Sequence, residues 1–240
     1  MKKSISVIIP LYNEERNLEA IITNINDIVS SLFDDYELLI FDDASTDKTG
    51  DIIDMFAKKN SKIKVFHNKK NMNTGYNFRM GIKYATKKYT MLLAAPDMLI
   101  PDSLKNYMTK TGTAAIVSNY VRNKKARLLY RRIISYLVTA ALNLMFGLHI
   151  KYYLGQLICE SKAIKEVRTT TNSFGLPAEV FIRLVKKGSS YKEFPIDIRK
   201  MKENSTSAFR IRNIAGFIAM VLRLFFEINF NKKKRKSSWL

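Results

Sequence analysis

Short apolar runs alternate with segments of helical periodicity along the first hundred residues. The runs rich in β-branched residues, typical of strands, cover residues 4–11, 36–41, 63–67 and 89–94. Between them, apolar residues recur every three or four positions over residues 18–32, 47–59 and 75–88. This order predicts an α/β fold in which right-handed crossovers build a mostly parallel sheet with helices on both faces.

Beyond residue 101 the pattern is less regular. We expect a strand at residues 114–120, a helix at 177–187, a strand at 191–196 and a final helix at 210–228. Residues 133–150 contain no Asp, Glu, Lys or Arg and are long enough to be a membrane-span candidate. Because Ser135, Asn143 and His149 interrupt this stretch inside the predicted domain, we expect an interfacial or core helix instead.

Three features of the sequence limit which compartment and which kind of metal site we expect. The apolar start of the chain is shorter than the core of a signal peptide and is followed at once by charge, so we interpret it as a strand. The single cysteine, Cys159, excludes an intrachain disulfide and fits a reducing compartment. Two distant histidines without neighbouring cysteines make a zinc site improbable.

Charge is distributed unevenly along the chain. Residues 1–100 carry 14 Lys or Arg and 13 Asp or Glu, whereas the remaining residues carry 27 and 8. The basic second part indicates a polyanionic partner, such as an anionic membrane or a phosphorylated substrate. Nucleic acid is not expected, because the basic residues alternate with aliphatic stripes and not with exposed aromatic side chains.

Polar clusters follow two of the predicted strands. Residues 12–15 follow the first and residues 42–47 the second, at the edge of a parallel sheet where ligands bind. This placement predicts a nucleotide-binding α/β enzyme. A simpler interpretation is that Asp43 and Ser45, or Thr46, only cap the next helix.

Three motifs in order resemble the inverting family-two glycosyltransferases, which have the GT-A fold. They are SVIIPLYNEERNL (6–18), YELLIFDDASTDKTGDI (36–52) and NKKNMNTGYNFRMGI (68–82). The likeness runs from residue 4 to about residue 210 and is greatest to the dolichyl- or polyprenyl-phosphate sugar synthase branch. It implies that the nucleotide-sugar donor is bound by Pro10, Tyr12, Glu14, Asp42, Asp43, Ser45, Asn71, Gly75 and Arg79.

The resemblance also implies a divalent cation, Mg²⁺ or Mn²⁺. The family typically places Asp-x-Asp after the fourth strand, but this chain has Ala95-Pro96-Asp97. Asp97 is therefore the expected metal ligand, with weaker metal dependence than usual because Ala95 replaces the first carboxylate. The alternative is that Asp97 merely opens the following turn.

The acceptor half carries a candidate base and several cations. Glu179 is the candidate base, although the family's usual base position reads Pro177. A phosphate acceptor needs no base, since it is mostly dianionic at neutral pH. The implied acceptor residues are Arg122, Arg131, Arg132, Arg199 and Ser205, with Arg132 counted beside Asp97 and Glu179 as catalytic. A solvated basic face without a specific role is the alternative.

The C-terminal segment indicates membrane contact. The helix at 210–228 has an apolar stripe, but Arg223 and Glu227 would be costly in a bilayer centre, so it is expected to lie in the headgroup plane. The basic run 232–236 and Trp239 would strengthen binding to an anionic surface. We therefore expect a peripheral protein on the cytoplasmic side of the membrane.

These expectations give one leading function and two alternatives. Residues 1–209 would be the catalytic domain, with a donor half (1–100) and an acceptor half (101–209), and residues 210–240 an amphipathic helix and basic tail. The chain would transfer a sugar from a UDP- or GDP-sugar to a polyprenyl phosphate, alone or with a separate membrane subunit. The alternatives are transfer to a hydroxyl of a glycan or lipid-linked saccharide, and a catalytically degenerate nucleotide-sugar binder.

Overall fold

The computed structural model describes residues 3–200 and 211–230. The strands are β1 (Ser4–Leu11), β2 (Asp35–Asp42), β3 (Ile63–His67), β4 (Tyr89–Leu92), β5 (Ile116–Val121), β6 (Leu157–Glu160) and β7 (Tyr191–Ile196). The α-helices are α1 (Leu18–Leu32), α2 (Thr49–Lys59), α3 (Thr74–Tyr84), α4 (Pro101–Met108), α5 (Leu129–Phe146), α6 (Ser161–Lys165), α7 (Leu176–Lys186) and α8 (Ile211–Asn229). Two 3₁₀ turns lie at Pro96–Met98 and Lys124–Ala126.

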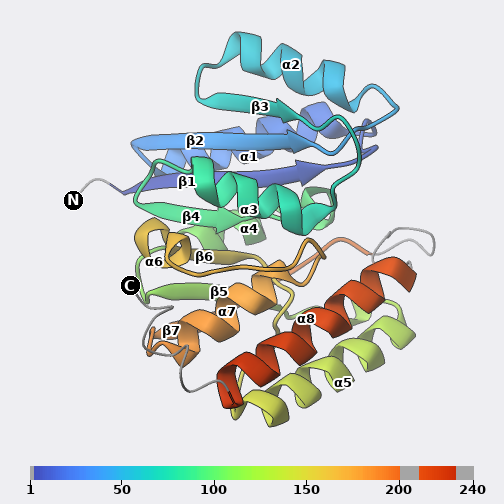
Figure 1. Cartoon of the computed structure of the whole chain (residues 1–240). Helices are drawn as coiled ribbons and strands as arrows, with labels where there is room; N and C mark the ends of the chain where they lie inside the picture. The colour runs from blue at the N-terminus through green and yellow to red at the C-terminus, as the bar shows by residue number, and fades with distance from the viewer. Residues whose placement is uncertain (1–2, 201–210, 231–240) are drawn as a thin grey trace.

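One seven-stranded sheet, in the order β3-β2-β1-β4-β6-β5-β7, forms the centre of the molecule (Figure 1). Strands β3, β2, β1 and β4 pair in parallel, as the sequence pattern predicts. Strand β6 pairs antiparallel with both β4 and β5, and β5 pairs in parallel with β7. The expected α/β architecture is confirmed, but the sequence pattern missed the antiparallel strand β6 and the short helices α4 and α6.

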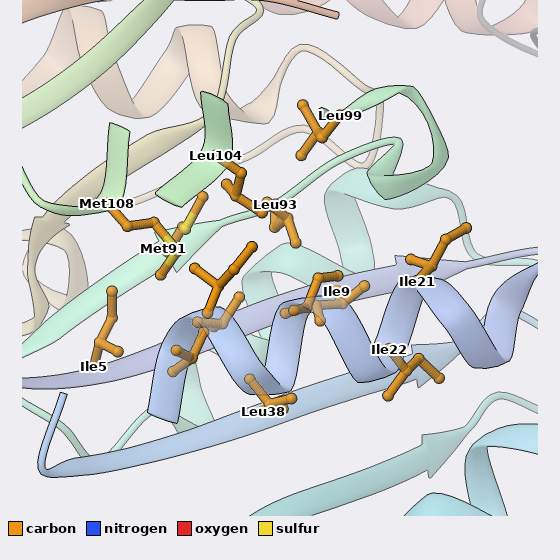
Figure 2. Packing of buried hydrophobic residues seen from close by; sticks show 14 of the residues in the cluster. Ile5, Ile9, Ile21, Ile22, Leu38, Met91, Leu93, Leu99, Leu104 and Met108 are labelled. Atoms are coloured by element: carbon orange, nitrogen blue, oxygen red, sulfur yellow. The ribbon is translucent and has the colours of Figure 1, made fainter. Parts of the chain in front are cut away.

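Alternate residues of each strand point to opposite faces of the sheet. Both sets of side chains are buried, because helices pack against both faces. In β1, Ile5, Val7 and Ile9 pack with α1 and α4, as Figure 2 shows for part of this cluster. Ile8 points to the other face and packs with Phe78 of α3 in a second cluster that also includes residues of α5, α7 and α8. The apolar start of the chain is therefore a core strand.

Several expected element boundaries need correction. Neither Ser45 nor Thr46 caps α2, which begins after Lys48 without a side-chain cap. The apolar stretch expected at 133–150 is α5, which starts earlier, includes two arginines and ends at Gly147 in the left-handed conformation that glycine tolerates (φ 57°). No helix in the described part of the chain is both long and apolar enough to cross a membrane.

The final helix is apolar on two sides, which its expected single stripe did not anticipate. Phe217, Val221 and Leu224 are buried, whereas Ile218 and Leu222 are about half exposed. Phe217 stacks on Phe174, with ring centroids 5.3 Å apart, and a side chain at Gly175 would collide with it. Helix α8 is therefore packed onto the rest of the fold. The division of the chain at residue 210 stays a prediction.

Candidate functional site

The carboxyl ends of six strands meet at one edge of the sheet. This follows from the pairing, because β6 alone runs in the opposite direction between β4 and β5. Asp42 is the last residue of β2, and the loops after β1 and β4 carry Glu14 and Asp97. The loops after β5 and β7 carry Arg122 and Arg199. Acidic and basic candidates from both halves of the sequence thus share this edge.

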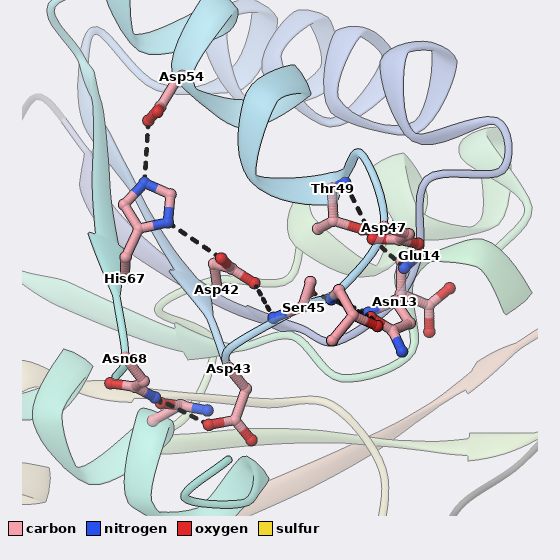
Figure 3. Close-up of polar contacts among 12 residues, drawn as sticks. Asn13, Glu14, Asp42, Asp43, Ser45, Asp47, Thr49, Asp54, His67 and Asn68 are labelled. Atoms are coloured by element: carbon pink, nitrogen blue, oxygen red, sulfur yellow. Dashed lines mark hydrogen bonds and ion pairs between the residues drawn. The ribbon is translucent and has the colours of Figure 1, made fainter. Parts of the chain in front are cut away.

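The loops after β1 and β2 are joined by hydrogen bonds (Figure 3). The backbone N–H of Asn13 donates to Oγ of Ser45 at 3.0 Å, and that of Thr46 donates to Oδ1 of Asn13 at 2.8 Å. The N–H of Glu14 donates to Oγ1 of Thr49 at 2.8 Å. Ser45 therefore holds the first loop in place, and the two loops form one structural unit.

Asp42 is almost buried and both of its oxygens have partners. Oδ1 accepts from the backbone N–H of Ser45 at 3.0 Å, and Oδ2 lies 3.0 Å from Nδ1 of His67. The other ring nitrogen of His67 lies 3.0 Å from Oδ1 of Asp54. Burial alone would raise the pKa of Asp42, but the hydrogen bonds from Ser45 and His67 outweigh it and lower the pKa. Asp42 is therefore a fixed anion at this edge.

Asp43 organises the neighbouring loop (Figure 3). Its carboxylate accepts from the backbone N–H groups of Met72 and Asn73, at 2.8 and 2.9 Å, and from the Asn68 amide at 2.8 Å. The side chain is 4% exposed, and these three donors explain why a carboxylate is tolerated there. Asp43 thus fixes the conformation of the segment that leads into α3, where sequence reasoning placed Asn71, Gly75 and Arg79.

The α3 candidates have different environments. Asn71 is exposed, and the Arg79 guanidinium lies 5.6 Å from the ring centre of Tyr76. Gly75 is buried, and a Cβ there would lie 2.3 Å from the carbonyl oxygen of Ser173. Glycine at this position therefore has a packing reason. Pro10 and Tyr12, at the end of β1, are half-buried.

Four loops at this edge contain a residue other than glycine with positive φ. These are Asn13 (53°), Ala44 (62°), Asn73 (70°) and Ala95 (46°), which follow β1, β2, β3 and β4 respectively. Alanine in this conformation is strained, and such strain is concentrated at functional sites. The backbone geometry thus supports the location of the site independently of the side chains.

Glu14 in the loop after β1 and Asp97 in the turn after β4 are two half-buried carboxyl groups that interact electrostatically. Burial, together with the negative charges of Asp97 and Asp47, raises the pKa of Glu14 to about 7. Burial raises the pKa of Asp97, partly offset by backbone hydrogen bonds and by the charge of Arg199. Within residues 3–200 and 211–230, no group of three or more His, Cys, Asp or Glu side chains is arranged to hold a metal ion. A cation bound at Asp97 would need oxygens of the ligand and water, which suits Mg²⁺.

The acceptor-side arginines lie in three settings. The Arg122 guanidinium forms an ion pair with Asp197, and the backbone N–H of Arg122 donates to the carbonyl oxygen of Ile196. Arg199 follows β7 and donates its backbone N–H to Met98 at 2.8 Å, next to Asp97. Arg131 and Arg132 lie in the first turn of α5. Ser205 lies outside the described residues.

Glu179 is enclosed within the fold. Its side chain is 0% exposed and accepts from the Arg183 guanidinium at 3.0 Å and from the backbone N–H groups of Thr170 and Thr171. Arg183 also contacts Glu227 of α8 at 2.7 Å. This environment favours a structural role that joins α7 to α8, and it disfavours the predicted general base.

Sequence reasoning missed the residues that hold the acidic side chains in place. His67 was noted there only as an improbable zinc ligand, yet it is the register partner of Asp42 across β2 and β3. The sequence contained a signal for this contact, because Asp42 and His67 are each the last residue of neighbouring strands. Asn68 and Thr49 carried no comparable signal, since their contacts depend on the loop conformation.

Comparisons with known proteins identify relatives of this chain. The family model described as "Glycosyl transferase family 2" matches residues 6–169. The glycosyltransferase GlyG of Streptococcus pneumoniae is 24% identical over 123 residues, covering 50% of this chain and 40% of that protein. The Methanococcus voltae dolichyl N-acetyl-α-D-glucosaminyl phosphate 3-β-D-2,3-diacetamido-2,3-dideoxy-β-D-glucuronosyltransferase is 38% identical over 105 residues, covering 42% of this chain and 32% of that protein. The chain thus matches less than half of the length of these relatives.

Solved structures show the same fold. Glucosyl-3-phosphoglycerate synthase from Mycobacterium tuberculosis in complex with UDP superimposes with a TM-score of 0.65 at 17% identity, covering 94% of this chain and 80% of that chain. The same enzyme with Mn²⁺, UDP and phosphoglyceric acid has a TM-score of 0.65 at 16% identity, covering 94% and 78%. At this identity the likeness establishes the fold of the chain.

Proposed function

The chain belongs to glycosyl transferase family 2, has the GT-A fold and is a glycosyltransferase, and on this basis we propose that it is an inverting enzyme that transfers a sugar from a UDP- or GDP-sugar to a polyprenyl phosphate. The observation that carries the proposal is the pairing of charges at one sheet edge. Glu14 and Asp97 contribute carboxyl groups after β1 and β4, and Arg122 and Arg199 reach the same edge from β5 and β7.

The donor would lie over the joined loops after β1 and β2. Asp42, which is fixed by His67 and Ser45, would accept hydrogen bonds from the nucleoside. Asp97 would hold a divalent cation together with diphosphate oxygens, and the solved neighbours with Mn²⁺ or Mg²⁺ and UDP support this expectation. When bound, the cation would neutralise charge on the departing diphosphate.

A phosphate acceptor fits the basic side of this edge. Guanidinium groups bind phosphate oxygens through paired hydrogen bonds. A phosphate oxygen would attack the anomeric carbon, forming the new C–O bond as the bond to the diphosphate breaks and its electron pair leaves with the diphosphate. No proton need be removed from a dianionic phosphate, which is consistent with the enclosed position of Glu179.

A hydroxyl acceptor on a lipid-linked saccharide is the second candidate. It is favoured by the Methanococcus voltae relative, whose name specifies a sugar-bearing dolichyl phosphate as its acceptor. This reaction requires a positioned base, worth roughly 10²–10⁴ in rate. Glu179 would reach the acceptor only after its contacts with Arg183 and the backbone were broken.

The two candidates can be separated with the purified chain. Thermal shifts with a panel of nucleotide sugars and Mn²⁺ would first identify the donor. Transfer would then be assayed with undecaprenyl phosphate and, in parallel, with a polyprenyl-linked N-acetylglucosamine. Product on the unglycosylated phosphate supports the proposal, and product only on the saccharide supports the second candidate. Donor binding without transfer to either acceptor would favour a degenerate binder or the need for a separate membrane subunit.

A further inference from the structure

Exposed apolar side chains are concentrated on two helices. Among the described residues, all large hydrophobic side chains that are exposed lie on α5, on α8 or at Phe230, with the exceptions of Met55 and Tyr84. Leu144 of α5 is 86% exposed, and Leu222 of α8 is 49% exposed. A surface of this kind on one part of a molecule is typical of an interaction site.

The two helices lie side by side at the margin of the molecule (Figure 1). The ring of Phe146 in α5 meets that of Phe225 in α8, with centroids 6.3 Å apart. Leu142 of α5 and Leu224 of α8 are buried in one core cluster with residues of α7. Each helix is therefore anchored by its inner side, which leaves the outer sides free to form a shared apolar surface.

The charges on and around this surface are almost all positive. Residues 121–159 contain no Asp or Glu, and Arg132 of α5 is exposed. On α8, Arg223 is exposed beside Leu222, and Glu227 contacts Arg183. Long basic side chains can bury their stems at an apolar boundary while their charges reach anionic groups. The surface thus combines exposed apolar side chains with the exposed cations Arg132 and Arg223.

We propose that the outer face of α5 and α8, defined by Leu137, Leu144, Ile218, Leu222 and Phe226, docks on an anionic phospholipid bilayer. Paired amphipathic helices with basic side chains bind at the boundary between headgroups and acyl chains. A second copy of the chain is a poorer occupant, because a symmetric contact would bring the same positive charges together. Complementarity of charge therefore selects the bilayer.

The position of the face connects it to the candidate site. Helix α5 begins a few residues after the carboxyl end of β5, where Arg122 lies. Both helices start on the side of the molecule to which β1 and β2 point (Figure 1). Docking would place the acceptor edge close to the lipid surface. The docking itself does not rest on the acceptor proposed above, since vesicle binding is measured without transfer.

The test uses the full chain and vesicles of phosphatidylcholine alone or mixed equally with phosphatidylglycerol. The face variant carries Leu137→Ser, Leu144→Ser, Ile218→Ser and Leu222→Ser. The matched control carries Met55→Ser and Tyr84→Ser, which remove the two exposed hydrophobic side chains elsewhere. A third variant replaces the basic residues 232–236 with glutamine. Flotation should show binding of the wild type to anionic vesicles, at least tenfold weaker binding of the face variant and unchanged binding of the matched control.

Other outcomes would overturn the docking face. The first is that the wild type does not bind anionic vesicles. The second is that the face variant binds these vesicles as the wild type does, while the tail variant does not bind them. The third is that the wild type is a dimer and the face substitutions convert it to a monomer. Thermal melts and donor-induced thermal shifts of each variant confirm that it is folded. They also separate failure of docking from failure of the proposed enzymatic function.

Discussion

His67 faces Asp42 across the β2–β3 pair, with Nδ1 of the imidazole 3.0 Å from Oδ2 of the carboxylate. Burial lowers the pKa of His67, but its hydrogen bonds to Asp42 and Asp54 and their charges outweigh this and raise the pKa above the ordinary value. The pair connects the donor-side carboxylate of Asp42 to β3, the outermost strand on this side of the sheet. Its strength should therefore depend on pH.

The stabilisation from His67 should be lost as pH rises. A histidine whose folded pKa is raised contributes fully below its unfolded pKa of about 6.5, and the contribution disappears as pH rises through the folded pKa. The melting temperature of His67→Gln should thus lie below that of the wild type at pH 6, and the gap should narrow by pH 9. The control is His149→Gln, since His149 is the other histidine and is exposed. A gap independent of pH would contradict the ion pair.

Gly75→Ala should destabilise the fold. The added Cβ would lie 2.3 Å from the carbonyl oxygen of Ser173 and 2.5 Å from the backbone carbon of Asn172, so the backbone must shift. Overpacking of this kind costs about 1–3 kcal/mol, or about 2–4 °C in melting temperature per kcal/mol for a chain of this size.

Gly50→Ala is the matched control for this substitution. Gly50 lies in α2, and its nearest neighbour to a Cβ is at 3.4 Å, an ordinary contact. Alanine is the better helix former by about 1 kcal/mol, so this variant should be neutral or more stable. Equal melting temperatures for the two variants would show that the approach of α3 to residues 172–173 is looser than described.

Glu179→Gln should reduce stability more than catalysis. Breaking a buried ion pair costs about 3–5 kcal/mol, and the carboxylate accepts from Arg183 and from two backbone N–H groups. The companion variant Arg183→Met keeps the carboxylate but removes its partner, and it should lower the melting temperature similarly. Both should retain kcat within about tenfold at a temperature where they are folded.

A general-base role predicts a different result for the same pair of variants. Glu179→Gln alone would then lose roughly 10²–10⁴ in kcat, while Arg183→Met would keep its activity. Measuring kcat and the melting temperature of both proteins decides between the two roles. The pH–rate profile adds a second readout, because loss of a base removes the acidic limb of that profile.

The main architecture could be predicted because local pattern and tertiary environment agree there. β1 and β2 are buried on both faces, so both are mainly apolar, apart from Ser6 and Glu37, which are hydrogen-bonded to each other. The polar residues at and after their ends fall at one edge of the sheet by parallel pairing. Strand β6 could not be predicted in this way. It has four residues, and its antiparallel position depends on partners far away in the sequence.

Residue types in the site were easier to predict than their roles. Asp43 was expected to contact the donor or cap a helix. The structure adds that it accepts from three groups of the loop after β3, and its contact with the donor stays a prediction. Glu179 was placed correctly on a helix, yet the burial of its side chain depends on α8 and Thr170. Both outcomes depend on contacts between segments, which periodicity and motif spacing do not encode.

Ala95→Asp should strengthen metal binding. Ala95 has φ 46°, a conformation that costs alanine roughly 1–2 kcal/mol and that Asp and Asn tolerate better. Aspartate there would add a second carboxylate two residues before Asp97, and hard cations prefer such oxygen ligands. We expect about tenfold tighter Mn²⁺ binding in the presence of UDP, measured by calorimetry.

The control is Ala95→Asn, which relieves the same strain without adding charge. Both variants should be at least as stable as the wild type, but only the aspartate should tighten Mn²⁺ binding. Equal gains in both would mean that relief of strain, and not a missing ligand, limits metal affinity, and no gain in either would place the cation away from this turn.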